Sequence, residues 1–260
     1  MLQHKFQTMR LEFAFSNAQV SDPYYGTPPL NLQIMDAVIS LLASKGMNVI
    51  LDMHNLHDMD GFFGSDTWVQ DWVQLAAHYK NNASVVAYEI YNEPYCDSSY
   101  CNWDKQYVSS TAQTGAGYLR AIQAIRASGD NHTIVVETPL HSAYAGDASL
   151  LSVPNLAYTY HVNARYCQSL GFPYSAAGMT ACAQSIGKQF LGFTSQYHKP
   201  QWFGELYLNF RGTPVVENAL GSGIINFAVQ NHYDVDILGY HSGGVALYNT
   251  VLNGSQWASH

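Results

Sequence analysis

Short apolar runs alternate along this 260-residue chain with longer amphipathic stretches. The runs are rich in β-branched and aromatic residues and predict buried strands, whereas apolar residues spaced three and four apart predict helices. The predicted strands are Phe6–Phe13, Asn48–His54, Val85–Asn92, Thr133–Glu137, Leu156–His161, Gln201–Glu205 and Val235–Tyr240. The predicted helices are Leu30–Lys45, Thr67–Lys80, Thr111–Ala127, Ala181–Tyr197 and Val215–Asn231. This alternation indicates a parallel sheet built from right-handed βαβ units.

Local signals support several of these boundaries. Gly46 follows the first helix in the position of a C-terminal cap, and the fourth helix ends before Lys199-Pro200, where proline disfavours helix. Gly221 and Gly223 lie inside the last predicted helix and weaken that prediction. The chain has no linker or low-complexity tract, so residues 1–260 are predicted to form a single domain.

Polar residues gather where the predicted strands end. They are His54, Asn55, Asn92, Glu93, Glu137, His161, Glu205 and His241. In a parallel barrel all the carboxyl ends of the strands lie on one face, which is where enzymes of this architecture keep their active sites. The pattern therefore predicts a cleft lined by carboxylates, amides and imidazoles.

Two strand-end glutamates are the strongest chemical signal. Tyr88-Glu-Ile-Tyr-Asn-Glu-Pro94 carries an apolar strand into Asn92-Glu93, and Trp202-Phe-Gly-Glu205 carries a later strand into Glu205. Glycoside hydrolysis uses such a pair, because one carboxyl group protonates the leaving oxygen while the other attacks the anomeric carbon or activates water.

Five motifs in order resemble glycoside hydrolase family 5, a member of clan A. They are Thr8-Met-Arg10-Leu11, Asp52-Met-His54-Asn55, Asn92-Glu93-Pro94, Tyr158-Thr-Tyr-His161 and Gly204-Glu205. The resemblance implies a (β/α)8 TIM-type barrel and retention of configuration through a covalent glycosyl-enzyme. It implies Glu93 as general acid/base and Glu205 as nucleophile, and no cofactor or metal.

The resemblance also implies roles for the surrounding residues. Asn92 would bond the sugar 2-hydroxyl, Arg10 would keep the nucleophile ionised, and His54 and His161 would line the subsite of the cleaved sugar. Asn55 is a further candidate sugar contact, as is Trp103 in the loop after Glu93. Asp52 and Glu89 are interpreted as buried hydrogen-bonding groups, whereas Glu137 is left open between the cleft and a structural role.

Three departures from the family pattern stand out. Asn163 occupies the position where the family usually has a tyrosine, and Tyr240 or His241 would replace its strand-eight tryptophan. Arg10 belongs to the family's second strand, so the barrel is expected to be N-terminally shortened, with about seven strands. The resulting unpaired edge predicts a homodimer or higher oligomer.

Charge narrows the choice of partner. The net charge is −8 and only 12% of residues are charged, which argues against nucleic acid and anionic membranes and favours a neutral polysaccharide. No apolar run is long enough to span a membrane. Met1–Phe6 is polar, so it is not expected to be a signal peptide.

The four cysteines allow three pairings, of which Cys96–Cys101 with Cys167–Cys182 is favoured because each pair is local. Disulfides would indicate an oxidising compartment or a thermophile, and the protein is predicted to be extracellular.

The sequence thus predicts an endo-acting β-1,4-glucanase. Mannanase, xylanase and mixed-linkage glucanase activities would use the same catalytic pair and stay open. A weakly active carbohydrate-binding remnant of the barrel is a second hypothesis. A third is a metal-dependent hydrolase built on His54 and His57, whose spacing suits a metal pair.

Overall fold

The computed structural model describes residues 7–15, 30–54, 65–92, 117–137, 153–206 and 214–235. The chain forms two compact units, Met1–Tyr158 and Thr159–His260, with the boundary inside a strand. That residues 1–260 form a single domain stays a prediction. In chain order the elements are β1 (Thr8–Phe13), α1 (Leu32–Ala43), β2 (Asn48–Met53), α2 (Asp66–Tyr79), β3 (Val85–Glu89), α4 (Gly117–Ala127), β4 (Thr133–Glu137), β5 (Leu156–Val162), α6 (Ala164–Ser169), α7 (Ala176–Tyr197), β6 (Gln201–Leu206) and α8 (Pro214–Asn231).

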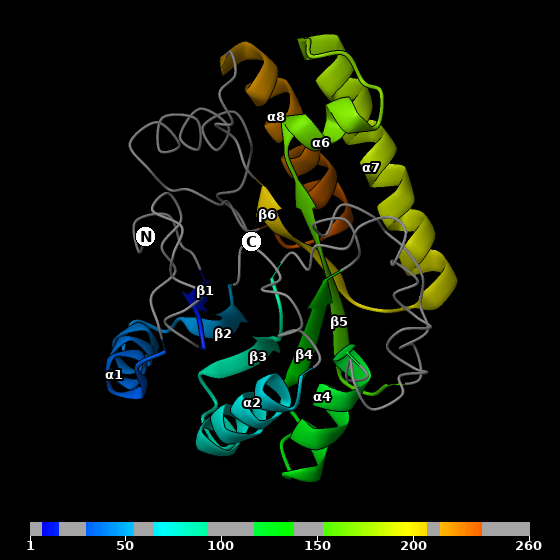
Figure 1. The fold of residues 1–260 in the computed structure, drawn as a ribbon. Coiled ribbons are helices and arrows are strands. Elements are labelled where there is room, and N and C mark those ends of the chain that lie inside the picture. Colours follow the sequence, from blue (N-terminus) through cyan, green and yellow to red (C-terminus); the bar gives the residue numbers. More distant parts are fainter. Residues whose placement is uncertain are drawn as a thin grey trace. The chain divides into compact units, whose positions relative to one another are not determined.

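The first unit is a parallel sheet with helices between its strands. β1 pairs with β2, β2 with β3 and β3 with β4, each in parallel, and β5 follows β4 in the strand order. Parallel neighbours need a crossover, and α1 and α2 supply the first two. Figure 1 shows α2 beside α4, against which it packs. The predicted βαβ repetition is therefore present in this unit.

Local chemistry starts the helices of the first unit. The side chain of Asn31 accepts a hydrogen bond from the Ile34 amide at 3.1 Å, and Ser65 accepts one from the Trp68 amide at the same distance. Both residues cap a helix N-terminus, as their short polar side chains favour. Gly46 has a φ of +74°, a conformation that costs glycine little and that ends the α1 segment.

The apolar face of α2 packs against the strands through two tryptophans. Trp68 and Trp72 are fully buried, and both indole N–H groups donate to the carbonyl of Ile90, at 3.2 and 2.9 Å. Their spacing of four residues places them on one face of the helix. The two bonds also hold the segment just after β3, which leads into Asn92.

The second unit holds β6 next to β5 in the strand order, together with α6, α7 and α8. Val235 makes an isolated parallel bridge with Phe203, and the rest of the predicted strand Val235–Tyr240 lies outside the described residues. The described residues thus contain six strands, against about seven expected.

One predicted helix starts earlier than expected, and one short helix was not predicted. α7 begins at Ala176 rather than Ala181, because Ser175 caps it by accepting from the Gly178 amide at 3.1 Å. The short helix α6 was not predicted, because its six residues are too few to show a helical repeat.

α8 continues through Gly221 and Gly223 because α7 packs closely against it, as Figure 1 shows. A Cβ at Gly223 would lie 2.6 Å from the Cβ of Ala183, and one at Gly187 would lie 2.6 Å from the Phe227 ring. The small residues allow this approach, which offsets the cost of glycine inside a helix. A tertiary contact therefore overrides the local signal.

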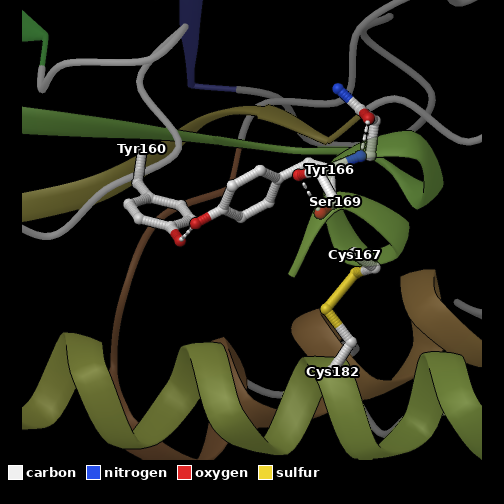
Figure 2. Close-up of a disulfide and its surroundings, with 6 residues drawn as sticks. Tyr160, Tyr166, Cys167, Ser169 and Cys182 are labelled. Atoms are coloured by element: carbon white, nitrogen blue, oxygen red, sulfur yellow. Dashed lines mark hydrogen bonds between the residues drawn. A yellow bond between two sulfur atoms is a disulfide. The ribbon is translucent and has the colours of Figure 1, made fainter. Parts of the chain in front are cut away.

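A disulfide joins α6 to α7 in the second unit. Cys167 and Cys182 are bonded, with their Cα atoms 5.8 Å apart, and both side chains are fully buried (Figure 2). The prediction of this pair is confirmed, whereas Cys96 and Cys101 lie outside the described residues. The bridge fixes the segment that directly follows β5.

Candidate active site

The predicted site residues that the structure describes lie in or just after strands. In the first unit Arg10 is in β1, His54 follows β2 and Asn92 follows β3. In the second unit His161 is in β5 and Glu205 is in β6. The other predicted site residues lie outside the described part of the chain: Asn55, Glu93, Trp103, Tyr240 and His241.

Arg10 is the centre of a buried cluster in the first unit. Its guanidinium donates from Nε to Glu89 Oε2 at 2.6 Å and from Nη2 to Glu89 Oε1 at 2.9 Å, a bidentate pair. Nη2 also donates to Asn92 Oδ1 at 2.7 Å and lies 3.1 Å from Asp52 Oδ2. Arg10 thus orients several groups at the ends of neighbouring strands.

The carboxylates around Arg10 come from neighbouring strands in register. Glu12 is opposite Asp52, and Asp52 is opposite Glu89, so the three occupy one row across β1, β2 and β3. The side chains of Asp52 and Glu89 are fully buried, which confirms their interpretation as buried hydrogen-bonding groups. Glu137, also buried, lies 3.5 Å from Arg10 Nη2. Glu137 is therefore a member of the buried cluster around Arg10.

Glu89 was not predicted to be the bidentate partner of Arg10. One sequence signal could have suggested it: Glu89 ends β3, which is only two strands away from β1, the strand of Arg10. Which carboxylate the arginine binds nevertheless depends on the register of the sheet. The predicted pairing of Arg10 with Glu205 stays a prediction.

His54 and Asp52 form a hydrogen-bonded pair, with Nδ1 of the imidazole 2.7 Å from Oδ2 of the carboxylate. Burial lowers the pKa of His54, but the charge and hydrogen bond of Asp52 outweigh it and, helped by Glu12, raise that pKa to about 9. Burial raises the pKa of Asp52 to about 7, against the opposing charge of Arg10. Both pKa values are raised, so Asp52 and His54 bind protons more tightly in the folded protein than in the unfolded chain.

These raised pKa values make the pair a source of pH-dependent stability. Its stabilisation is present at low pH and is lost as pH rises, from about 4 to 7 for Asp52 and from about 6.5 to 9 for His54. We expect Asp52→Asn to lower the pKa of His54, because the imidazolium stays buried and loses its counter-charge. The pKa is measured from the His54 ring-proton NMR shift, and the pH dependence from urea unfolding.

Asp36→Asn is the matched control for that experiment. Asp36 also holds a histidine, with its Oδ1 3.0 Å from Nε2 of His78, but both side chains are about two-fifths exposed. Removal of its charge should leave the His54 titration unchanged. A His54 pKa that stays near 9 in Asp52→Asn would contradict the assigned cause.

Asn92 is positioned by the same arginine. It is 1% exposed, and its Oδ1 accepts from Arg10, so the side-chain amide has a fixed orientation. Within the described part of the chain its Nδ2 group finds no hydrogen-bond partner. A buried donor left unsatisfied costs free energy, so this amide is poised to donate to a ligand.

In the second unit Glu205 and His161 lie side by side. Nδ1 of His161 is 3.5 Å from Glu205 Oε2, and the two residues are 2% and 6% exposed. Gly204 permits the close packing of β5 and β6 beside them, because a Cβ there would lie 1.9 Å from Thr159 Oγ1. The second unit thus holds a nearly buried carboxylate next to an imidazole.

Asn163 has a role that differs from that of the family tyrosine. It caps α6, its side chain accepting from the Tyr166 amide at 2.8 Å. Tyr166 in turn meets Tyr160, whose hydroxyl donates to it at 3.0 Å (Figure 2). The residue at this position therefore shapes the segment after β5.

A metal ion is disfavoured at the one described cluster of the first unit that could hold it. Glu12, Asp52 and His54 present ligand atoms within 4.8 Å of one another. However, Arg10 lies 3.1 Å from Asp52 and 4.0 Å from Glu12, so its charge would repel a cation there. His57, the other member of the metal hypothesis, lies outside the described residues.

Solved structures of endoglucanases resemble this fold. A hyperthermophilic endo-β-1,4-glucanase in complex with substrate has a TM-score of 0.71 at 14% identity, covering 96% of this chain and 86% of that one. Cel5A from Thermotoga maritima has a TM-score of 0.66 at 18% identity, covering 93% and 80%. These likenesses confirm the predicted (β/α)8-barrel type of fold.

The sequence has curated and family-level relatives. An endoglucanase from Paenibacillus polymyxa is 29% identical over 147 residues, which is 52% of this chain and 36% of that protein. The chain thus spans about a third of the length of this relative. The family model described as cellulase, glycosyl hydrolase family 5, matches residues 1–213. Since this match covers most of the chain, the protein belongs to glycosyl hydrolase family 5.

Proposed function

We propose that the protein is a retaining, endo-acting glycoside hydrolase that cleaves β-1,4-glucan by double displacement. Family membership supports the reaction class. Glu205 is the proposed nucleophile and Glu93 the proposed general acid/base. Asn55, Trp103, Tyr240 and His241 are proposed as further sugar contacts and lie outside the described residues.

The observation that carries the proposal is the side-chain amide of Asn92. Arg10 occupies its oxygen at 2.7 Å, so the NH2 group is the end left to contact a ligand. A sugar hydroxyl is a suitable acceptor, because it satisfies the buried donor without bringing in a charge. Asn92 directly precedes Glu93, so this contact would hold the sugar beside the proposed acid.

The chemistry divides between the two glutamates. Glu93 protonates the glycosidic oxygen while the Glu205 carboxylate attacks the anomeric carbon and forms a covalent glycosyl-enzyme. Glu93 then takes a proton from water, which attacks the same carbon and releases Glu205. The 3.5 Å distance between Nδ1 of His161 and Glu205 Oε2 supports a role for His161 in orienting the nucleophile. His54, held by Asp52, is proposed to line the subsite of the cleaved sugar.

β-Mannanase activity is the second candidate. Thermotoga maritima Cel5A has been solved with mannotriose and with cellobiose, and both structures have folds similar to this one, with TM-scores of 0.68 and 0.69. Xylanase and mixed-linkage glucanase activities would use the same catalytic pair. The substrate is in each case a neutral β-linked polysaccharide.

The test is hydrolysis of a substrate panel followed by NMR of the fresh products. We expect soluble cellulose derivatives and cello-oligosaccharides to be cut internally, with the new reducing end appearing first as the β-anomer. Retention requires the two carboxyl groups to approach to about 5–5.5 Å in the working enzyme. First appearance of the α-anomer would refute double displacement, and preferential cleavage of mannan would replace glucan as the substrate.

Secretion and self-association stay predictions. No helix among the described residues is long and apolar enough to cross a membrane. The buried Cys167–Cys182 bond is compatible with an oxidising compartment, where such bonds persist. A homodimer is likewise a proposal.

A further inference from the structure

Tyr174 is an exposed aromatic in a chain that buries most of its described aromatics. It is 36% exposed and is the one aromatic among the large hydrophobic side chains left exposed in the described residues. The others are aliphatic: Leu32, Ile34, Leu41, Leu170, Leu191, Val215 and Val229. Burial in the core accounts for most of the described aromatic residues but not for Tyr174.

The turn that carries Tyr174 is held rigidly. The amide of Ser175 donates to the Pro173 carbonyl at 2.8 Å, and Pro173 packs so closely on α7 that a Cβ at Gly178 would lie 2.1 Å from its oxygen. The Cys167–Cys182 bond ties the preceding helix to α7 (Figure 2). A ring held in this way loses little conformational entropy when a ligand stacks on it.

A buried carboxyl group anchors the tyrosine ring. The hydroxyl of Tyr174 donates to Glu217 Oε1 at 3.0 Å, and Glu217 is 2% exposed. Burial raises the pKa of Glu217, and its Oε2 has no hydrogen-bond partner in the described part of the chain. Burying a carboxyl group with one oxygen unsatisfied costs free energy. Such a cost is understandable if the carboxyl group serves to fix the ring in place.

Chain topology puts Tyr174 on the same side as the candidate nucleophile. α6 begins directly after β5, so the turn between α6 and α7 lies where β5 ends. α8 follows β6, so Glu217 in its first turn lies on the side where β6 ends. The Tyr174–Glu217 bond therefore joins segments that leave the strand ends carrying His161 and Glu205. Barrels of this type place their ligands at these ends.

We propose that Tyr174 is an aromatic platform that stacks on a pyranose ring of a neutral β-linked glucan chain, beside the strand ends that carry His161 and Glu205. The C–H face of such a pyranose ring is flat and apolar, so it packs favourably on an aromatic ring that is partly exposed, as Tyr174 is. A neutral chain also suits a protein with a net charge of −8. The choice of glucan as ligand rests on the proposed function.

The experiment measures polymer binding without hydrolysis, in the Glu205→Gln background. Migration in native gels containing soluble mixed-linkage β-glucan gives the dissociation constant, and the acidic protein enters such gels readily. We expect Tyr174→Ala to weaken retention by about tenfold, the size of one aromatic contact, whereas Tyr174→Phe keeps the ring and stays within about threefold. Leu170→Ala is the matched control, since Leu170 lies near Tyr174 in sequence and is 43% exposed.

Each result decides the inference. Tyr174→Ala that binds the polymer as tightly as its parent overturns it, as does an equal loss in Leu170→Ala. Should Tyr174→Ala fail to fold, Tyr174→Leu, which keeps apolar bulk without a ring face, takes its place. Hydrolysis by the parent chain is measured separately. Tyr174-dependent retention without hydrolysis supports the platform and rejects the proposed activity, whereas hydrolysis with Tyr174-independent retention does the reverse.

Discussion

Replacing Glu205 by glutamine is expected to lower kcat on a soluble β-glucan by about 10³-fold or more, because an amide cannot attack the anomeric carbon. Glu205 is only 6% exposed, but glutamine has nearly the same size, so the substitution should leave the fold intact. KM should change little, since the substituted group acts mainly in the transition state. Reducing-sugar release and thermal melting measure the two effects.

A second substitution tests whether Glu205 forms a covalent bond. Glu205→Ala removes the carboxylate and leaves space for a small external nucleophile. Azide should then partly restore cleavage and give a glycosyl azide of inverted configuration, because the anion attacks from the face that Glu205 occupied. Asp66→Asn, changed at a side chain 72% exposed on α2, should keep full activity. A Glu205→Gln enzyme that retains a tenth of the activity or more would remove the nucleophile assignment.

Replacing Arg10 by methionine is expected to lower the free energy of unfolding by about 3–5 kcal/mol at neutral pH, the cost of leaving buried charges unpaired. Three buried carboxyl groups, Asp52, Glu89 and Glu137, lie within 3.5 Å of its guanidinium. Part of the loss should be recovered at low pH, where the carboxyl groups become neutral. Urea unfolding at several pH values measures both effects.

Two comparisons sharpen the Arg10 experiment. Arg120→Met removes an arginine whose partner Asp66 is 72% exposed, so its effect should stay within about 0.5 kcal/mol. Arg10→Lys keeps the charge but cannot form the bidentate pair with Glu89, so its loss should be intermediate. An Arg10→Met protein as stable as Arg120→Met would show that the carboxyl groups are not held by this charge.

Elements with a long apolar repeat were predicted correctly. Features that depend on caps or on contacts between distant residues were missed. Five of the predicted helices and six of the predicted strands correspond to elements of the described structure. The early start of α7 and the existence of α6 were missed, because both depend on caps, Ser175 and Asn163, rather than on an apolar repeat. Gly223 weakened the prediction of α8, yet the helix continues there because this glycine lies against Ala183 of α7.

The site was predictable in residue type but not in pairing. Arg10, His54, Asn92, His161 and Glu205 all lie in or just after strands, as their motifs predicted. The bidentate partner of Arg10, by contrast, follows from the register of β1, β2 and β3 and could not be assigned from spacing along the chain. The raised pKa of His54 likewise depends on the folded chain, which brings Asp52 and Glu12 close to the imidazole.

The alternation of strands and helices and the chemistry available at the strand ends could be read from the sequence, which also favoured the disulfide Cys167–Cys182. These properties depend on residues close together in the sequence: on side-chain periodicity, on short loops and on residue type. Three features required the folded chain: Arg10 binds Glu89 and Asn92 together, Asn163 caps a helix, and Tyr174 is held at the surface by Glu217. Hydrogen bonding and burial depend on distances between atoms, and packing brings those atoms together from distant parts of the chain.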